Sequence, residues 1–388
     1  MKRLAGGLLD RKLLNSGQTL DQSLLWVITM MVGFSLIMVY SASIAYAAKD
    51  GGEMGTQWHY FVRQIMFVSI GGSCGYLAFK IPMRTWAKFM PYILTFSFIL
   101  LILVLGVGRE INGAKRWIHV GPFNIQPSEP FKLAVILYLS SFMTRRVDIL
   151  TNFKKVWFAG IPVGLGLFLL LLEPDMGSFV IVAVVSVALL FLGGLPFMWF
   201  LGVVGIGASM IVLLILFEPY RMARVVSFLD PWADPYGAGY QLSQALIAFG
   251  RGEWFGVGLG ASMDKLFYLP EAHTDFILAV IAEEFGFMGV LALMGTYVWI
   301  VVRAFSIGKR ARDLEQYFSG FVAKGIGVWL GIQSFFNIGV NIGLLPTKGL
   351  TLPLISYGGS AVIVMLVCMA LLLRIDWESR RLMRGYKV

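Results

Sequence analysis

The chain has 388 residues, of which 58% are hydrophobic and only 14% are charged, and its mean hydropathy is +0.77. These values exclude a soluble globular domain of ordinary composition. In a chain this apolar, the net charge of +10 reflects Lys and Arg in cytoplasmic loops rather than a nucleic-acid surface. The sequence therefore predicts an all-α polytopic membrane protein that does not bind nucleic acid.

Ten apolar segments approach the length that a bilayer span takes, about 20 residues. They lie near 22–44, 59–80, 87–107, 127–144, 156–172, 177–193, 196–217, 272–303, 316–342 and 355–374. Both termini are predicted to be cytoplasmic, because more than half of the 32 Lys and Arg residues then fall on that side.

We expect one membrane domain over 1–388. It has a cytoplasmic N-terminal tail at 1–21, a membrane core at 22–374 and a cytoplasmic C-terminal tail at 375–388.

The same orientation places four connections on the outer side of the membrane. They are 106–127, 173–178, a long loop at about 218–271, and 343–354. Within the long loop, the spacing of apolar residues over 240–250 predicts a short amphipathic helix. This helix either lies in the headgroup plane or covers the end of the bundle.

Ionisable residues collect at the ends of the later segments. A charge in the middle of a bilayer costs about 2.5 kcal/mol or more, so such residues usually face a protein interior or an aqueous cavity. They are Arg63, Glu129, Lys132, Asp175, Asp275, Glu283, Glu284, Lys324 and Lys348. Snorkelling into headgroups explains Arg63 and Lys324 equally well, whereas Lys132, Asp275 and Lys348 favour a functional role in an outward-opening cavity.

A stretch rich in carboxylates enters the eighth apolar segment. Pro270 is typical of a helix start, so we expect Glu271 and Asp275 to lie one turn apart on the same face of a helix. Glu283 and Glu284 would lie roughly 12 Å deeper. An unpaired charge is poorly tolerated there, so we expect both to be paired with cations or protonated.

Five short motifs occur in one order along the chain. They are Asn112-Gly-Ala-Lys-Arg-Trp-Ile118, Gln126-Pro-Ser-Glu129 with Lys132, Glu173-Pro-Asp-Met-Gly177, Tyr268-Leu-Pro-Glu-Ala-His-Thr-Asp-Phe276 with Glu283-Glu-Phe-Gly286, and Leu352-Pro-Leu-Ile-Ser-Tyr-Gly-Gly-Ser360. Through these motifs the chain resembles the SEDS family (shape, elongation, division and sporulation) from about residue 20 to 377. The run Leu345-Pro-Thr-Lys-Gly-Leu-Thr-Leu-Pro353 is similar to the division branch rather than the elongation branch.

The resemblance implies an enzyme that polymerises lipid II into the glycan strands of peptidoglycan. The Asp of the His-Thr-Asp-Phe motif, Asp275 here, is implied as the catalytic carboxylate, and we expect it to act as general base. Lys348, Lys132 and Arg116 are implied as cations that hold the pyrophosphate of the substrate. One displacement of undecaprenyl pyrophosphate would invert the anomeric carbon.

The resemblance also implies helpers and partners. Glu271 would tune Asp275 or help to hold a divalent cation, Mg²⁺ or Mn²⁺, and Ser356 of the last motif is expected to bind substrate. The implied protein partners are a class B penicillin-binding transpeptidase and other division proteins. The implied location is the inner membrane of a bacterium at the division septum.

Two other functions fit the composition. The first is a transporter that flips a lipid-linked precursor, because intramembrane charge marks transport pathways as readily as catalytic sites. The second is a non-catalytic scaffold for division proteins. The predicted gathering of charge at the outer surface favours the enzyme over the transporter, which would need charged groups along both halves of the bundle.

Overall fold

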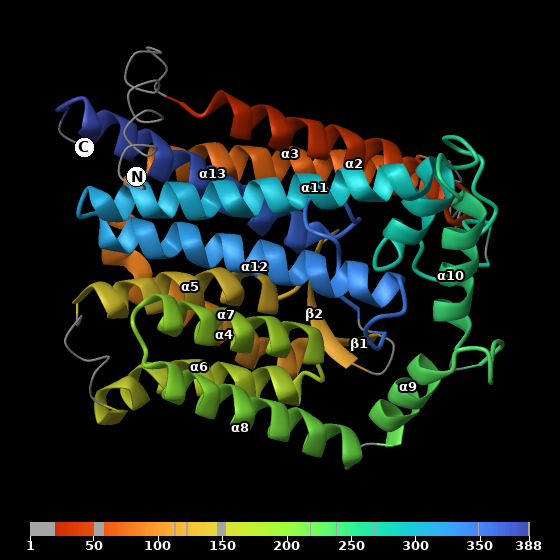
Figure 1. Cartoon of the computed structure of the whole chain (residues 1–388), viewed down its shortest axis with the longest axis horizontal. Coiled ribbons are helices and arrows are strands. Elements are labelled where there is room, and N and C mark those ends of the chain that lie inside the picture. Colours follow the sequence, from red (N-terminus) through yellow and green to blue (C-terminus); the bar gives the residue numbers. More distant parts are fainter. Residues whose placement is uncertain are drawn as a thin grey trace.

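The computed structural model describes residues 20–49, 58–111, 114–121, 123–145, 153–217, 219–237, 239–266, 268–347 and 349–386. Within these ranges, ten helices coincide with the ten predicted apolar segments, although several are longer. They are α2 (Gln22–Lys49), α3 (His59–Lys80), α4 (Met83–Val107), α5 (Ser128–Arg145), α6 (Phe153–Leu172), α7 (Met176–Leu192), α8 (Phe197–Leu216), α11 (Ile277–Asp313), α12 (Tyr317–Asn341) and α13 (Gly359–Met383). They run side by side in one bundle (Figure 1).

The composition of the helices fits a membrane bundle. Among the described residues, α2, α4, α11, α12 and α13 are long and apolar enough to cross a membrane, and α6, α7 and α8 contain shorter apolar runs. The predicted all-α polytopic fold is confirmed. The side of the membrane on which each connection lies stays a prediction.

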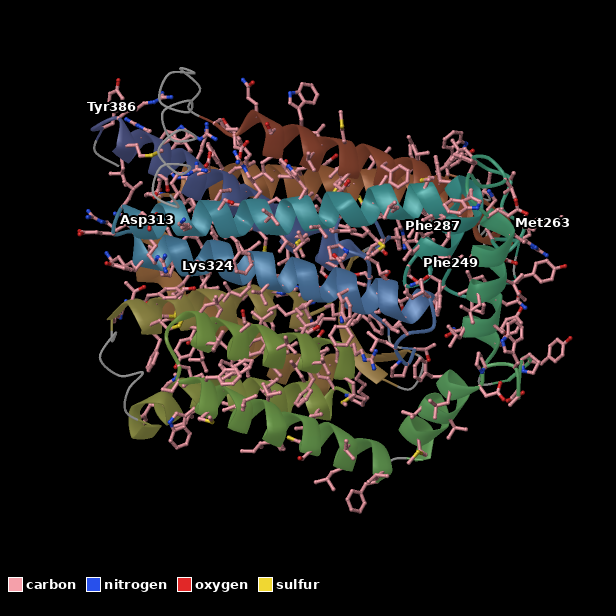
Figure 2. All side chains as sticks on the ribbon, viewed as in Figure 1. Phe249, Met263, Phe287, Asp313, Lys324 and Tyr386 are labelled. Carbon is pink, nitrogen blue, oxygen red and sulfur yellow. The ribbon has the colours of Figure 1, made fainter. Side chains whose placement is uncertain are left out.

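The connections predicted to be outer gather at one end of the bundle. A small antiparallel sheet is formed by β1 (Arg109–Ile111), β2 (Ala114–Val120) and β3 (Phe123–Ile125). The sheet, α9 (Pro219–Leu229) and α10 (Tyr240–Gly252) lie toward the right in Figure 1, away from the end of α13. Figure 2 shows Met263 at that end and Asp313, Lys324 and Tyr386 at the other.

The amphipathic run in the long loop forms α10, as predicted. Leu242, Ala245 and Ala248 are buried, and the helix packs on α11. It runs across the end of the bundle rather than along it (Figure 1). These contacts favour the interpretation of α10 as a cover over the bundle.

Buried ion pairs clamp the opposite end. Arg303 on α11 contacts Asp21 at 2.5 Å, just ahead of α2. Asp376 on α13 accepts from Arg310 of α11 at 2.6 Å and from Arg380 at 2.5 Å. Three helices are therefore tied together by charge, and α13 continues to Met383, beyond the expected end of the span at residue 374.

Helix α11 is interrupted at Gly286, where φ is 66° and ψ is −170°. The segment 253–258 lies beside the interruption and supplies the backbone partners that the helix loses. The bonds are Val257 N to Glu283 O (2.9 Å), Gly258 N to Glu284 O (3.1 Å), Phe287 N to Glu253 O (2.9 Å) and Met288 N to Trp254 O (3.1 Å). A Cβ on Gly286 would lie 2.4 Å from Gly256 N, so this position requires glycine.

Replacing Gly286 with alanine should therefore destabilise the protein. The backbone region is one that only glycine adopts readily, and forcing another residue into it costs about 1–3 kcal/mol. The measurement is thermal unfolding of the purified protein in detergent. Gly295→Ala is the control, because a Cβ added at Gly295 on the same helix meets open space. This variant should unfold at no lower temperature than wild type. Equal unfolding temperatures for the two variants would contradict the requirement for glycine at position 286.

Candidate functional site

Asp275 lies in a turn ahead of a helix. Helix α11 begins at Ile277, so the prediction that a helix starts at Pro270 and carries Glu271 and Asp275 on one face is wrong. Glu271 has a φ of 57°, and its carbonyl oxygen accepts from the backbone N–H of Thr274 at 3.1 Å. Its carboxylate accepts from the Thr274 hydroxyl at 2.6 Å, so the Glu271 side chain closes the turn.

Hydrogen bonds to three consecutive backbone carbonyl oxygens hold this turn in place. Tyr357 N donates to His273 O at 3.0 Å, Ser356 Oγ donates to Thr274 O at 2.6 Å, and the side-chain amides of Asn337 and Asn341 donate to Asp275 O at 2.9 and 3.0 Å. Asp275 as a residue is half-buried. Its backbone is therefore fixed from α12 and from the loop before α13, while the residue as a whole is not fully buried.

The loop before α13 passes through the bundle without being helical. Side chains of the surrounding helices bond its carbonyl oxygens: Asn337 to Leu350 (2.6 Å), Gln333 to Thr351 (2.9 Å), Tyr297 to Pro353 (2.5 Å) and Ser35 to Ile355 (2.7 Å). Irregular backbone at membrane depth is tolerated only where protein satisfies its polar groups in this way.

The same loop reaches the Asp275 carboxylate. A Cβ built on Gly349 would lie 3.1 Å from Asp275 Oδ2, so the backbone at Gly349 packs directly against the carboxylate. Lys348, one of the predicted pyrophosphate-binding cations, lies outside the described residues.

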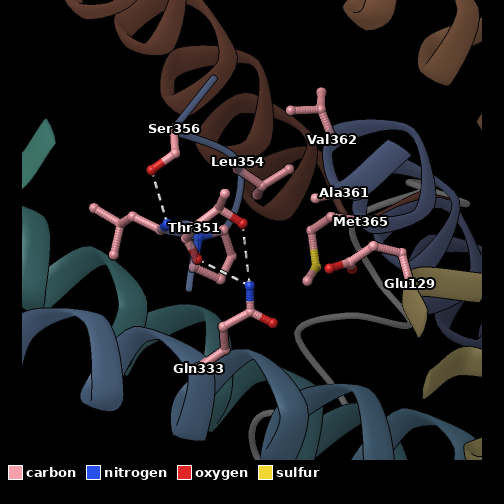
Figure 3. A pocket seen from close by; sticks show the side chains of 10 residues that line it. Glu129, Gln333, Thr351, Leu354, Ser356, Ala361, Val362 and Met365 are labelled. Carbon is pink, nitrogen blue, oxygen red and sulfur yellow. Dashed lines mark hydrogen bonds between the residues drawn. The ribbon is translucent and has the colours of Figure 1, made fainter. Parts of the chain in front are cut away.

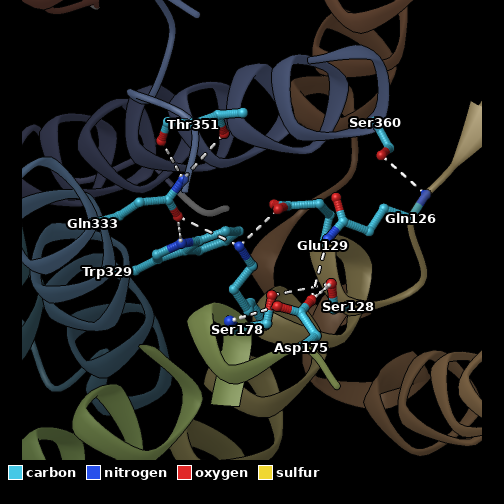
Figure 4. A network of polar contacts seen from close by, with 10 residues as sticks. Gln126, Ser128, Glu129, Asp175, Ser178, Trp329, Gln333, Thr351 and Ser360 are labelled. Carbon is cyan, nitrogen blue, oxygen red and sulfur yellow. Dashed lines mark hydrogen bonds and ion pairs between the residues drawn. The ribbon is translucent and has the colours of Figure 1, made fainter. Parts of the chain in front are cut away.

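Lys132 is enclosed within the bundle. Its ammonium group contacts Glu129 Oε1 at 2.8 Å and Gln333 Oε1 at 3.4 Å (Figure 4), and it lies 5.0 Å from the centre of the Trp329 ring. Only 3% of the residue is exposed. Lys132 is therefore a buried, paired cation in this arrangement.

A small cavity lies between α12 and the loop before α13. Its polar lining residues are Glu129, Gln333, Thr351 and Ser356 (Figure 3), and its other six lining residues are apolar. Its volume is about 10 Å³, close to the room that one water molecule takes. Glu129 and Gln333, which contact Lys132, and Ser356, which bonds the Asp275 turn, therefore share one cavity.

Arg116 contacts the turn between α6 and α7. From β2 it donates to the carbonyl oxygen of Pro174. The next residue, Asp175, caps α7 and binds the start of α5 (Figure 4). Its partners are Ser178 N (3.1 Å), Gln126 Nε2 (3.1 Å) and Ser128 Oγ (3.0 Å). Arg116 is therefore connected to the helix that carries Lys132.

Glu173, the first residue of the motif Glu173–Gly177, carries a buried carboxyl group for which the sequence predicts no role. It is fully buried, and both of its carboxyl oxygens have no hydrogen-bond partner among the described residues. Burial, with a further contribution from Asp175 and an opposing one from Arg116, raises its pKa to about 8. At neutral pH the protonated form is therefore favoured.

Glu283 and Glu284 are paired, as predicted. Glu284 accepts from Lys265 at 2.8 Å, and Lys265 also donates to Ser41 on α2 at 3.0 Å. Glu283 accepts from Ser262 Oγ at 2.5 Å and lies 3.7 Å from Arg251. These acids anchor the long loop to α11.

The amides of α12 are the site residues that sequence reasoning missed. Gln333, Asn337 and Asn341 are spaced four residues apart, which puts them on one face of an apolar helix. That spacing is a signal the sequence contains. Their targets could not be predicted, because each binds a carbonyl oxygen of a distant turn.

The described residues do not form a metal site on their own. No group of three or more His, Cys, Asp or Glu side chains among them could hold a metal ion, and the Glu271 carboxylate is already bonded to Thr274.

Known proteins share the fold and the order of these motifs. A family model described as "Cell cycle protein", for FtsW, RodA and SpoVE, matches residues 22–381. The chain belongs to the SEDS family. It is 52% identical to "Probable peptidoglycan glycosyltransferase FtsW" of Neisseria gonorrhoeae, over 98% of this chain and 90% of that protein. It is 50% identical to the protein of the same name from Aromatoleum aromaticum, over 96% and 91%.

Solved SEDS structures are similar as well. A chain described under "Structural coordination of polymerization and crosslinking by a peptidoglycan synthase complex" matches with a TM-score of 0.77 and 28% identity, over 93% of this chain and 98% of that one. The rod shape determining protein RodA of Thermus thermophilus matches with a TM-score of 0.67 and 26% identity, over 92% and 97%. The predicted membership of the SEDS family, and of its division branch, is confirmed.

Replacing Lys265 with methionine should strongly destabilise the protein, because Glu284 would stay buried without its cation. Breaking a buried pair in this way costs about 3–5 kcal/mol. Unfolding temperature in detergent is the readout. The double variant Lys265→Met with Glu284→Leu should recover much of the loss, and the exposed Lys309→Met should have no effect; failure of the double variant to recover would contradict the pairing.

The raised pKa of Glu173 predicts a stability that falls with pH. The folded state favours the protonated acid, so its contribution is complete below the ordinary pKa of 4.5 and is lost as pH rises through about 8. Glu173→Gln should flatten the fall in unfolding temperature across that window. The exposed Glu315→Gln should follow wild type, and an unchanged slope in Glu173→Gln would refute the assignment.

Proposed function

We propose that this protein is a peptidoglycan glycosyltransferase that polymerises lipid II at the division septum. The observation that carries the proposal is the Asp275 turn. Its backbone is held by donors from α12 and from the loop before α13, and Asp275 as a residue is half-buried. A carboxylate on a rigid backbone, on a residue that is not fully buried, is the arrangement that a general base needs.

The reaction joins two sugars in one step. Asp275 takes the proton from the 4-hydroxyl of the acceptor sugar as that oxygen attacks the anomeric carbon of the donor. The bond from that carbon to the pyrophosphate breaks, and undecaprenyl pyrophosphate leaves with the electron pair. One displacement inverts the carbon, and one carboxylate suffices because pyrophosphate leaves readily once its charge is neutralised.

Lys348, Lys132 and Arg116 are proposed to supply that neutralising charge. In the arrangement described, Lys132 is bonded to Glu129 and Arg116 to the Pro174 carbonyl. Pyrophosphate binding by either cation therefore takes an exchange of these partners for phosphate oxygens, which are strong acceptors for both side chains.

Ser356 and Glu271 are proposed to position Asp275. Ser356 is 1% exposed, and its hydroxyl donates to Thr274 O while accepting from Leu352 N at 2.8 Å. The role of Ser356 in substrate binding stays a prediction, and we propose that its hydroxyl also holds the Asp275 turn. Glu271 closes the same turn through Thr274.

A divalent cation, Mg²⁺ or Mn²⁺, is proposed only as an ion that arrives with the substrate. Magnesium in such sites takes much of its coordination from substrate phosphates and water. The described side chains provide no cluster that would hold it alone, so no step above depends on it.

We further propose a class B penicillin-binding transpeptidase as partner, other division proteins as neighbours, and the bacterial inner membrane at the septum as location. The similar solved chain described with a peptidoglycan synthase complex and the "Cell cycle protein" family support this assignment.

Asp275→Asn should abolish polymerisation of lipid II by the purified protein. Loss of a general base typically costs about 10²–10⁴-fold in rate, and the amide cannot accept the proton. Glycan products are measured with and without the partner and with and without a chelator. Glu315→Gln, at an exposed carboxylate between α11 and α12, is the matched control and should keep the activity of the wild type.

Three outcomes would contradict the proposal. Polymerisation by Asp275→Asn at the wild-type rate would remove the catalytic assignment. Translocation of labelled lipid II in liposomes without glycan product would favour the transporter, and normal division of Asp275→Asn cells would favour the scaffold.

A further inference from the structure

A groove lies far from the Asp275 turn, between α4, α5 and α6. It measures about 500 Å³ and is lined by Met90, Tyr138, Ser141, Phe142, Arg145 and Phe158. Ligand sites in proteins typically measure about 300–1,000 Å³. Helix α5 begins at the polar network of Asp175 and ends at Arg145, so the groove lies toward the end predicted to be cytoplasmic.

Three polar side chains of one helix face this groove. Tyr138, Ser141 and Arg145 are spaced three and four residues apart on α5, which aligns them along one face. Arg145 forms no ion pair, and Tyr138 and Ser141 form no side-chain hydrogen bond, within the described part of the chain. Arg145 is exposed and Tyr138 is half-buried, and both line the groove.

Ser141 is the most informative of the three. It is only 2% exposed, and its neighbours Ser140 and Thr144 donate to carbonyl oxygens of their own helix at 2.7 and 2.8 Å. Ser141 makes no such bond among the described residues. Because Ser141 lines the groove, its hydroxyl is placed to donate to a ligand there.

The walls of the groove are suited to acyl chains. Phe158 on α6 is 64% exposed, and Phe89 and Tyr92 on the nearby turns of α4 are 50% and 69% exposed. In a membrane bundle these side chains face lipid. Tyr138 and Arg145 are about 10 Å apart along α5, a span that covers the step from a headgroup phosphate to the glycerol esters and upper acyl chains.

We propose that this groove is a binding site for an anionic phospholipid of the cytoplasmic leaflet. The Arg145 guanidinium binds the phosphate, Ser141 and Tyr138 donate to the glycerol ester oxygens, and Phe142 and Phe158 contact the acyl chains. Basic pockets between helices on the cytoplasmic side select such lipids, and that leaflet carries negative charge. The site stands independently of the proposed polymerisation of lipid II.

The experiment counts the lipids that remain bound. Purified full-length protein is titrated with phosphatidylglycerol or phosphatidylethanolamine and examined by native mass spectrometry. Arg145→Gln should weaken retention of phosphatidylglycerol about tenfold or more, as expected for loss of a charged hydrogen bond, and Tyr138→Phe about threefold. Arg312→Gln should match wild type, because this half-exposed arginine lies outside the groove and contacts Asp313. Excess inorganic phosphate should not displace the lipid.

Several results would overturn the proposal. Equal losses in Arg145→Gln and Arg312→Gln would show attraction to general surface charge. Equal retention of both lipids, unaffected by Arg145→Gln and Tyr138→Phe, would show packing of acyl chains alone. Displacement by inorganic phosphate would show an anion site without lipid specificity. Unfolding temperatures measured on the same samples confirm that each variant is folded.

Discussion

The irregular backbone of the loop before α13 is the constraint on which the rest of the site depends. Each unpaired carbonyl or N–H group inside a membrane bundle costs several kcal/mol. The bundle meets this demand with polar side chains on α2, α11 and α12. Because Asn337 bonds both this loop and Asp275 O, the group that stabilises the loop also places the carboxylate.

This arrangement explains why a bundle so rich in apolar residues retains amides in α12. An asparagine that lost either carbonyl would leave a buried donor unsatisfied, so its place is fixed by two segments that are distant in sequence. The same logic applies to Ser356, which donates to one turn and accepts from another. The polar residues of the interior therefore act as connectors between segments that cannot form regular hydrogen bonds.

Much of the fold could be predicted from the sequence, because apolar length determines where spans lie. The pairing of Glu283 and Glu284 could also be expected, since buried charge demands a partner. The Asp275 turn could not, because Pro270 indicates a helix start and the positive φ of Glu271 depends on tertiary contacts. The burial of Lys132 could not be predicted either, because it also depends on tertiary contacts. Its partners Glu129, Gln333 and Trp329 come from two helices.

The interruption at Gly286 divides α11 into a short outer part, 277–285, and a longer inner part, 287–313. The inner part is fixed at its far end by the ion pairs of Arg303 and Arg310. The short outer part follows Asp275 directly, and the segment 253–258 bonds both sides of the interruption, through Glu283 and Glu284 on the outer side and through Phe287 and Met288 on the inner side. The long loop therefore bridges the gap in the helix, so the part that continues from Asp275 is joined to the rest of α11 by the backbone of the loop as well as by Gly286.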